Sequence, residues 1–259
     1  MNALIFDCDG VLADTELHGH LVAFNRMWSE LRVPWHWSEA EYAEKLKIGG
    51  GKERMARVLD EPAFQAVYQV PEDPNARKEL LAGWHARKTA ILQDIISGGA
   101  LPGRPGIRRL SEEALQSGWN VAVASTSARP SVEAVLRYAV GKETAERFAV
   151  FAGDIVAKKK PAPDIYLLAL QELGLRPENC VVVEDSRNGL LAAVTAGIRT
   201  VVTTSYFTTE ERFDEAVLVV DSLGDPGSPA ITVKANRAGH KIGPYITLDD
   251  LSAVVTKNG

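Results

Sequence analysis

The sequence predicts an α/β protein with a doubly wound, parallel sheet and an inserted helical unit. The prediction depends on short apolar runs, on helical patterns between the later runs, and on one long segment with helical spacing throughout. The runs are rich in β-branched residues, which is typical of strands buried on both faces. They lie at residues 3–6, 121–124, 149–152, 181–183 and 200–202. Helical patterns at 131–138, 165–173 and 190–196 complete the strand–helix alternation of a parallel sheet.

Residues 17–96, between the first two runs, break this alternation. Four tryptophans and many apolar residues recur there at helical spacing, with no strand-like run of comparable strength. We therefore expect a helical domain at 17–97, inserted into an α/β core domain made of residues 1–16 and 98–259.

Two stretches rich in Gly and Pro are predicted to be loops of the core domain. The first, at 98–106, is the expected exit from the helical insertion. The second, at 224–229, reads as a loop. After it, a last apolar set at 242–255 predicts an edge strand or a helix.

The composition is that of a globular protein. The 259 residues are 46% hydrophobic and 24% charged, without the long apolar run of a membrane span. The start of the chain leaves no room for a signal peptide, so we expect a cytoplasmic location, or the plastid stroma if a transit peptide has been removed. Cys8 and Cys180 adjoin apolar runs and are expected to be buried thiols. A net charge of −5 disfavours nucleic acid as a partner, and we expect a monomer, not bound to membranes, that acts on a small anionic molecule.

Polar residues follow four of the five apolar runs. In a parallel sheet the carboxyl ends of the strands share one edge, where ligands bind. The residues concerned lie at 7–10, 125–127, 153–154 and 184–186. Asp7 and Asp9 are two apart, so in extended backbone they share a face while Cys8 points to the core. Gly10 then lets the backbone turn away.

Carboxylates that converge in this way repel each other unless a cation lies among them. Each acid taken singly is explained equally well as a helix cap or turn residue, but their conjunction favours a metal site. Oxygen ligands, without Cys or His pairs at zinc spacing, favour Mg²⁺.

Four ordered motifs resemble those of the haloacid dehalogenase superfamily. They are FDCDGV at residues 6–11, Ser125, Lys160 with Pro161, and EDS at 184–186. The resemblance implies a Rossmann-like core with a helical cap domain. DCDGVLADTE, LKIGGGKERM, FAGDIVAKKKPAPDIY and CVVVEDS are similar to the plant-type CbbY-like proteins, phosphatases of xylulose 1,5-bisphosphate, an inhibitor of Rubisco in the Calvin cycle. This similarity covers the chain to about residue 209, and the tail departs from it.

The resemblance implies a role for each motif residue. Asp7 would be the nucleophile, and Asp9 would protonate the departing sugar oxygen and then act as base for water. Ser125 and Lys160 would bind phosphoryl oxygens. Mg²⁺ would be held by Asp7, the backbone carbonyl of Asp9, Asp185 and, directly or through another group, Glu184.

Substrate recognition is expected from the helical insertion and from the strand ends. Backbone amides after the three glycines at 49–51 can hold phosphate or sugar oxygens. Taken alone, such glycines are as often a flexible turn, and the spacing of a P-loop is absent. The candidate substrate-binding residues are Glu16, His20, Gly50, Gly51, Lys52, Glu53, Arg54, Ser125, Thr126, Ser127, Arg129 and Lys160.

Two other functions fit the same residues. A sugar phosphomutase of the β-phosphoglucomutase type would return the phosphoryl group to a sugar, whereas a phosphatase passes it to water. A metabolite-binding protein would keep the fold without the chemistry, but the completeness of the four motifs favours an enzyme.

Overall fold

The chain divides into two units, which are described separately. The computed structural model describes residues 1–99, 101 and 103–256. The sheet unit contains Met1–Asp14 and Pro102–Gly259, and the helical unit contains Thr15–Leu101. Positions 100 and 102 of the expected exit loop, and 257–259 of the tail, lie outside the described residues.

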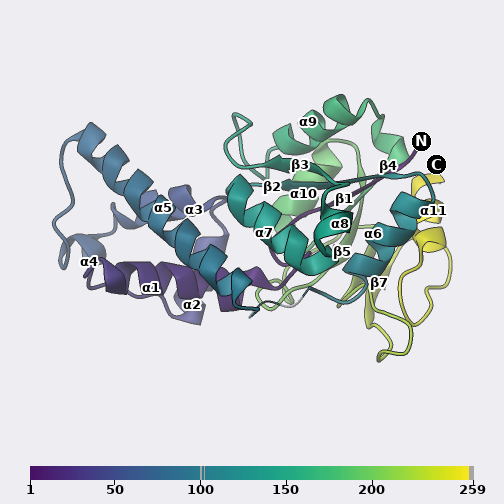
Figure 1. The fold of residues 1–259 in the computed structure, drawn as a ribbon, viewed down its shortest axis with the longest axis horizontal. Coiled ribbons are helices and arrows are strands. Elements are labelled where there is room, and N and C mark those ends of the chain that lie inside the picture. Colours follow the sequence, from purple (N-terminus) through teal and green to yellow (C-terminus); the bar gives the residue numbers. More distant parts are fainter. Residues whose placement is uncertain (100, 102, 257–259) are drawn as a thin grey trace. The chain divides into compact units, whose positions relative to one another are not determined.

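The described strands of the sheet unit form a single sheet in the order β3-β2-β1-β4-β5-β6-β7 (Figure 1). Neighbouring strands are parallel from β3 to β6, and β7 is antiparallel to β6. The predicted α/β fold with a parallel sheet is confirmed, and each of the five predicted runs is a strand. The strands are β1 (Ala3–Phe6), β2 (Asn120–Ser125), β3 (Ala149–Ala152), β4 (Cys180–Glu184), β5 (Arg199–Thr203), β6 (Leu218–Val220) and β7 (Val233–Asn236).

Helices cover both faces of this sheet (Figure 1). The three predicted helical patterns correspond to α7, α9 and α10. The apolar set at 242–255, for which the sequence allowed an edge strand or a helix, contains the helix α11. The edge strand β7 precedes that set and was not predicted. The helices are α6 (Ile107–Gln116), α7 (Arg129–Val140), α8 (Lys142–Ala145), α9 (Asp164–Leu173), α10 (Arg187–Thr195) and α11 (Leu248–Thr256), with a 3₁₀ turn η2 (Pro177–Asn179).

Burial on both faces explains why the central strands are continuous apolar runs. Side chains alternate along β1, so Ile5 joins a core cluster with Ala124, Val182 and residues of α9 and α10, whereas Phe6 stacks against Phe148. The strands are thereby fixed in register, and their carboxyl ends lie along one edge.

The helical unit has an aromatic core. Trp28 and Trp37 meet edge to face with ring centroids 4.6 Å apart, and Phe24 and Tyr42 pack around them. Its described residues include no strand, in keeping with the helical pattern of the sequence. Its elements are a π-helical turn η1 (Glu16–Leu21), α1 (Val22–Glu30), α2 (Glu39–Leu46), α3 (Gly51–Val58), α4 (Pro62–Gln65) and α5 (Pro74–Ser97).

Both cysteines lie in the interior of the sheet unit. Cys8 and Cys180 are buried and form no disulfide, which confirms the prediction of buried thiols. Burial raises the pKa of the Cys180 thiol to about 11, so this thiol is uncharged at neutral pH and a poor nucleophile. Among the described helices, none has both the length and the apolar character needed to cross a membrane.

Candidate active site

Three carboxylates meet where β1 and β4 end. Asp7 follows β1, Glu184 ends β4, and Asp185 follows it. The backbone N–H of Asp7 donates to the carbonyl of Val183 at 2.9 Å, which extends the pairing of the two strands to their tips. Each of the three residues offers one carboxylate oxygen within 4.8 Å of the other two, and all three residues are buried. Oxygen donors grouped in this way can hold a metal ion.

Lys160 joins two of these carboxylates. Its ammonium nitrogen lies 2.7 Å from Oδ1 of Asp7 and 2.6 Å from Oε1 of Glu184, and it also donates to the carbonyl of Ala124 at 2.9 Å. The three donors of the ammonium group therefore have three acceptors. Because the lysine is buried, this geometry fixes one positive charge beside Asp7.

The buried charges shift the ionisation of the site. Burial raises the pKa of Asp7 to about 8, against the attraction of Lys160 and with the support of Glu184 and Asp9. Burial, together with Glu184 and Asp7, holds the pKa of Asp185 well above its ordinary value. Burial lowers the pKa of Lys160, but Asp7 and Glu184 outweigh it and hold that pKa well above its ordinary value. One lysine does not neutralise three buried carboxylates, so the site favours a bound proton or a cation.

Asp185 is held between a glycine and a serine. Ser205 donates from its hydroxyl to Oδ2 of Asp185 at 2.6 Å. On the other side, a Cβ atom at Gly10 would lie 2.0 Å from the same oxygen, and the φ of Gly10 is +81°. The turn predicted at Gly10 therefore also brings the backbone against Asp185, where only glycine fits.

Asp9 is held by the loop after β2. The hydroxyl of Ser127 donates to Oδ2 of Asp9, and the backbone N–H of Ser127 donates to the hydroxyl of Ser125 at 3.1 Å. Ser125 is buried and Thr126 is half-buried. The loop places hydroxyl groups beside the first motif.

Tyr166 and Gly189 belong to this cluster but were not predicted. Tyr166 donates to Oε1 of Glu184 at 2.5 Å, and its ring centroid lies 4.8 Å from the Lys160 ammonium nitrogen. A Cβ atom at Gly189 would lie 2.0 Å from the carboxylate carbon of Glu184. Both residues lie in helices, where the apolar pattern accounts for them as core. The signal that could have revealed Gly189 is a glycine inside a helix, which often marks a close approach.

Two residues singled out in the sequence lie outside the carboxylate cluster. The sequence grouped Asp154 with the converging carboxylates, but it is exposed and pairs with Lys159 at 3.0 Å. An exposed carboxylate that is paired with its own lysine has no need of a shared metal. Arg129 begins α7, is 57% exposed and pairs with Glu133 one turn along the helix at 2.8 Å.

The helical unit contains a second polar group. Glu16 accepts a hydrogen bond from the hydroxyl of Tyr42 at 2.5 Å and lies 3.6 Å from Nη1 of Arg54. Arg54 is buried and also donates to the carbonyl of Ile48 at 3.0 Å. Gly50, with φ +97°, precedes α3, and the α3 residues that follow it are Gly51, Lys52 and Glu53, all half-buried.

His20 forms a separate contact with Lys88. The Nδ1 atom of His20 is in hydrogen-bond contact with the Lys88 ammonium group, and both residues are buried. The ammonium nitrogen of Lys88 lies 4.8 Å from the ring centroid of Phe24. The sequence did not indicate Lys88, because 68 positions separate it from His20.

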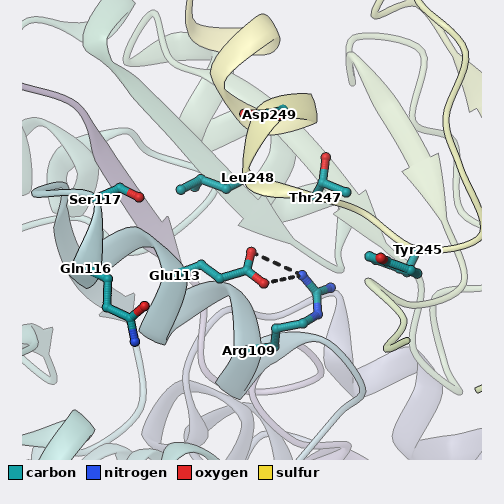
Figure 2. A pocket seen from close by; sticks show the side chains of 8 residues that line it. All are labelled: Arg109, Glu113, Gln116, Ser117, Tyr245, Thr247, Leu248 and Asp249. Carbon is teal, nitrogen blue, oxygen red and sulfur yellow. Dashed lines mark hydrogen bonds and ion pairs between the residues drawn. The ribbon is translucent and has the colours of Figure 1, made fainter. Parts of the chain in front are cut away.

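A surface pocket of about 320 Å³ lies elsewhere in the sheet unit (Figure 2). Its lining includes none of the predicted site residues. Arg109, on its wall, is paired with Glu113 at 3.3 Å. The residues that line it are Arg109, Glu113, Gln116, Ser117, Tyr245, Thr247, Leu248 and Asp249. Asp7, Lys160, Glu184 and Asp185 lie together at the strand tips, and none of them lines this pocket.

A parallel sheet with acids and a lysine at the carboxyl ends of its strands defines a class of hydrolases. Residues 1–197 match the family model of the haloacid dehalogenase-like hydrolases, and the chain belongs to this family.

Particular relatives are similar over most of the chain. A CBBY-like protein from Arabidopsis thaliana is 46% identical over 225 residues, which are 87% of this chain and 70% of that protein. The structure of CbbY from Rhodobacter sphaeroides in complex with phosphate is similar with a TM-score of 0.78 and 42% identity, over 88% of this chain and 97% of that one. A mutant of the same CbbY in complex with xylulose-(1,5)bisphosphate also has a TM-score of 0.78, with 41% identity, over 88% and 96%.

Proposed function

We propose that this hydrolase is a Mg²⁺-dependent sugar-phosphate phosphatase whose main substrate is xylulose 1,5-bisphosphate. One observation carries the proposal: the buried carboxylates of Asp7, Glu184 and Asp185 lie within 4.8 Å of one another, with Lys160 bonded to the first two. The CbbY relatives support the substrate, since one of them was solved with this bisphosphate.

In the proposed reaction Asp7 is the nucleophile. A carboxylate oxygen attacks the phosphorus atom, the bond to the sugar oxygen breaks, and an aspartyl-phosphate forms on Asp7. Asp9 gives a proton to the departing sugar oxygen. It then takes a proton from water, whose attack on phosphorus releases inorganic phosphate and restores Asp7.

The oxygen ligands of this site fit a magnesium ion. We assign Asp7, Asp185 and the backbone carbonyl of Asp9 as its ligands. When bound, the ion would supply positive charge that neutralises the phosphoryl oxygens. Oε1 of Glu184 accepts bonds from both Lys160 and Tyr166, and its Oε2 accepts from the Asp185 N–H at 3.2 Å. We therefore assign Glu184 chiefly to holding Lys160 in place, and to the metal through its negative charge.

Lys160 and Ser125 are assigned to the transferred phosphoryl group. Lys160 holds its charge beside the attacking oxygen of Asp7, where negative charge accumulates during transfer. Ser125 ends β2 at the same sheet edge. Thr126 and Ser127 continue this loop, and Ser127 orients the Asp9 carboxylate. Arg129 begins the next helix, where it remains a candidate for the substrate's anionic groups.

We assign the helical unit as the cap domain, with the domain limits 17–97 for the cap and 1–16 with 98–259 for the core. The start of α3 supports a role in binding, because helix N-termini bind anions. Buried Arg54 adds positive charge in the same helix. The residues assigned to the sugar and its second phosphate are Glu16, His20, Gly50, Gly51, Lys52, Glu53 and Arg54.

The remaining assignments concern the partner, the oligomeric state and the location of the enzyme. The net charge of −5 supports a small molecule, and not nucleic acid, as its partner. We propose a monomer that acts away from membranes, in the cytoplasm or the plastid stroma.

Phosphate release from a panel of phosphorylated pentoses and hexoses tests the function. We expect release from xylulose 1,5-bisphosphate with Mg²⁺, and none after EDTA treatment. An isomerised sugar phosphate without free phosphate would favour the mutase alternative. Binding of the bisphosphate without any turnover would favour the metabolite-binding alternative.

A further inference from the structure

Arg104 connects three segments of the sheet unit that are far apart in the sequence. It lies just before α6, and its guanidinium group donates to four backbone carbonyls. Nη1 donates to Gly10 and, at 3.1 Å, to Thr203. Nη2 donates to Thr204 at 2.7 Å and to Asp221 at 2.5 Å. A planar group with five N–H donors can bind this many carbonyls at once, whereas a lysine ammonium has three donors and no fixed plane.

Two of these carbonyls belong to the backbone on either side of Asp185. The Gly10 backbone lies so close to Asp185 that a Cβ atom would be 2.0 Å from its Oδ2. Thr204 immediately precedes Ser205, whose hydroxyl donates to the same oxygen at 2.6 Å. One guanidinium group thus holds both backbone segments that contact the Asp185 carboxylate.

Charge adds to this arrangement. The positive charge of Arg104 attracts the carboxylates of Asp185, Asp14 and Asp221. The backbone N–H of Arg104 also donates to the carbonyl of Leu12 at 2.9 Å, so residue 104 itself is tied to the segment that follows the first motif. Movement of the arginine would therefore displace Gly10 and Ser205 together.

We infer that Arg104 is a positioning residue that holds Asp185 in the geometry needed to bind a divalent cation. The inference rests on the proposed function, because it assumes that Asp185 is a metal ligand. It predicts that replacing Arg104 weakens metal binding by moving Asp185, although the three carboxylates remain.

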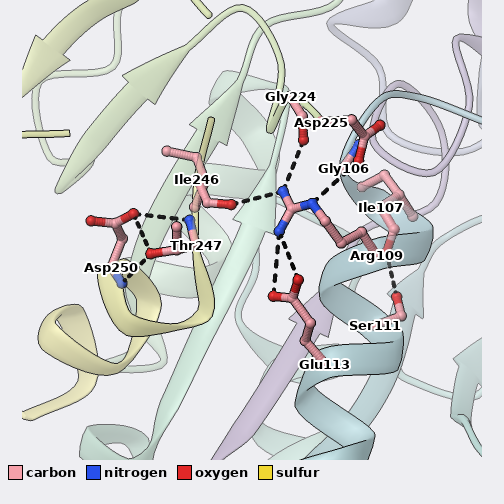
Figure 3. Close-up of polar contacts among 10 residues, drawn as sticks. All are labelled: Gly106, Ile107, Arg109, Ser111, Glu113, Gly224, Asp225, Ile246, Thr247 and Asp250. Carbon is pink, nitrogen blue, oxygen red and sulfur yellow. Dashed lines mark hydrogen bonds and ion pairs between the residues drawn. The ribbon is translucent and has the colours of Figure 1, made fainter. Parts of the chain in front are cut away.

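Arg109 provides a matched control (Figure 3). It too is an arginine that holds distant backbone, since its Nη2 donates to the carbonyls of Gly224 and Ile246, both at 2.8 Å. It also pairs with Asp225 at 3.2 Å and with Glu113. These bonds attach the tail of the chain to α6, and none of these partners contacts Asp185. A variant at Arg109 therefore shows how the loss of a structural arginine away from Asp185 changes stability and metal affinity.

The test measures Mn²⁺ binding to the full chain by electron paramagnetic resonance, in the absence of substrate. Thermal unfolding of the same variants is measured separately, in the absence of metal. We expect R104M to weaken Mn²⁺ affinity by about 10-fold or more, as for other groups that orient metal ligands. R104K should lose less, because it keeps the charge and some donors. R109M should lower the unfolding temperature and keep the wild-type affinity.

Two outcomes would overturn the inference, and they are distinguishable. If wild type binds Mn²⁺ and folded R104K and R104M bind it equally well, Arg104 does not position Asp185. The same conclusion follows if R109M weakens Mn²⁺ binding as much as R104M does. The loss of affinity would then come from replacing any structural arginine, and not from moving Asp185. If wild type itself binds no Mn²⁺, the proposed metal site fails, and the role of Arg104 fails with it.

Discussion

The backbone of Gly10 lies against the carboxylate of Asp185, so that a Cβ atom at residue 10 would be 2.0 Å from Oδ2 of Asp185. Asp185 cannot move away freely, because Ser205 bonds the same oxygen. The first motif and the last one are therefore fitted to each other at atomic contact, and this fit sets the shape of the carboxylate cluster.

We expect G10A to reduce metal affinity and phosphatase activity strongly, because the added methyl group displaces Asp185. The positive φ adds about 1 kcal/mol of strain or more. G118A is the matched control, since Gly118 has a φ of +76° and nothing within 4 Å of an added Cβ atom. Both variants should lose stability from backbone strain, measured by urea unfolding. Activity in G10A equal to that in G118A would show that the contact with Asp185 has no role.

Magnesium should stabilise the protein more at alkaline than at acidic pH. Burial raises the pKa of Asp7 to about 8 from an ordinary value of 3.8, and Asp185 shifts in the same direction. The folded, metal-free protein therefore holds protons that the unfolded chain releases, and this contribution to stability is lost as pH rises towards 8.

A metal ion must displace these protons, so its apparent affinity rises over the same range. We expect the increase in unfolding temperature caused by Mg²⁺ to be larger at about pH 8 than at about pH 6. Thermal unfolding scans with and without magnesium at each pH measure this increase. An increase of equal size at both pH values would contradict the proton displacement.

K160M should destabilise the protein and abolish turnover. It leaves the buried carboxylates of Asp7 and Glu184 without their shared cation, and breaking a buried pair typically costs about 3 kcal/mol. K159M is the control, because the Asp154 partner of Lys159 is exposed. We expect the loss in K160M to shrink at acidic pH, where Asp7, whose pKa is raised by burial, takes up a proton. If K160M has the unfolding free energy and the activity of the wild type, Lys160 does not have the role assigned to it as the shared cation of Asp7 and Glu184.

K52A should weaken hydrolysis of a bisphosphate by about 10-fold or more and that of a monophosphate little, since one charge-assisted contact contributes roughly 1.5–3 kcal/mol. Lys52 lies in the first turn of α3, beside the glycines at 49–51. Steady-state kinetics on both substrates measures the difference. K47A is the control, because Lys47 follows α2 and pairs with Glu44 on the surface. Equal losses on the two substrates would remove Lys52 from recognition of the second phosphate.

The sequence predicted the five buried strands because burial on both faces requires continuous apolar residues. β6 and β7 escaped notice for different reasons. β6 has only three residues, too few for a pattern. β7 lies at the sheet edge, and three of its four residues are exposed. Its sequence, VKAN, reflects pairing with β6 through the backbone and carries no hydrophobic alternation.

For the site, the strand-end rule placed Asp7 and Asp185 at one edge of the sheet, and the structure brings their carboxylates together. The roles of these residues remain predictions. The rule misplaced Asp154, because a strand end does not reveal that a nearby lysine will pair with an acid. Arg104 was beyond sequence reasoning altogether. Its partners are backbone carbonyls at residues 10, 203, 204 and 221, and any residue type supplies a carbonyl.

The phosphoryl group on Asp7 is the central claim, and mass spectrometry of enzyme quenched in acid during turnover tests it most directly. The account predicts a phosphoryl group on the peptide that contains Asp7, formed only with Mg²⁺ and substrate and absent from D7N, which should bind substrate without releasing phosphate. A phosphoryl group on another residue, or phosphate release by D7N at the wild-type rate, would contradict it.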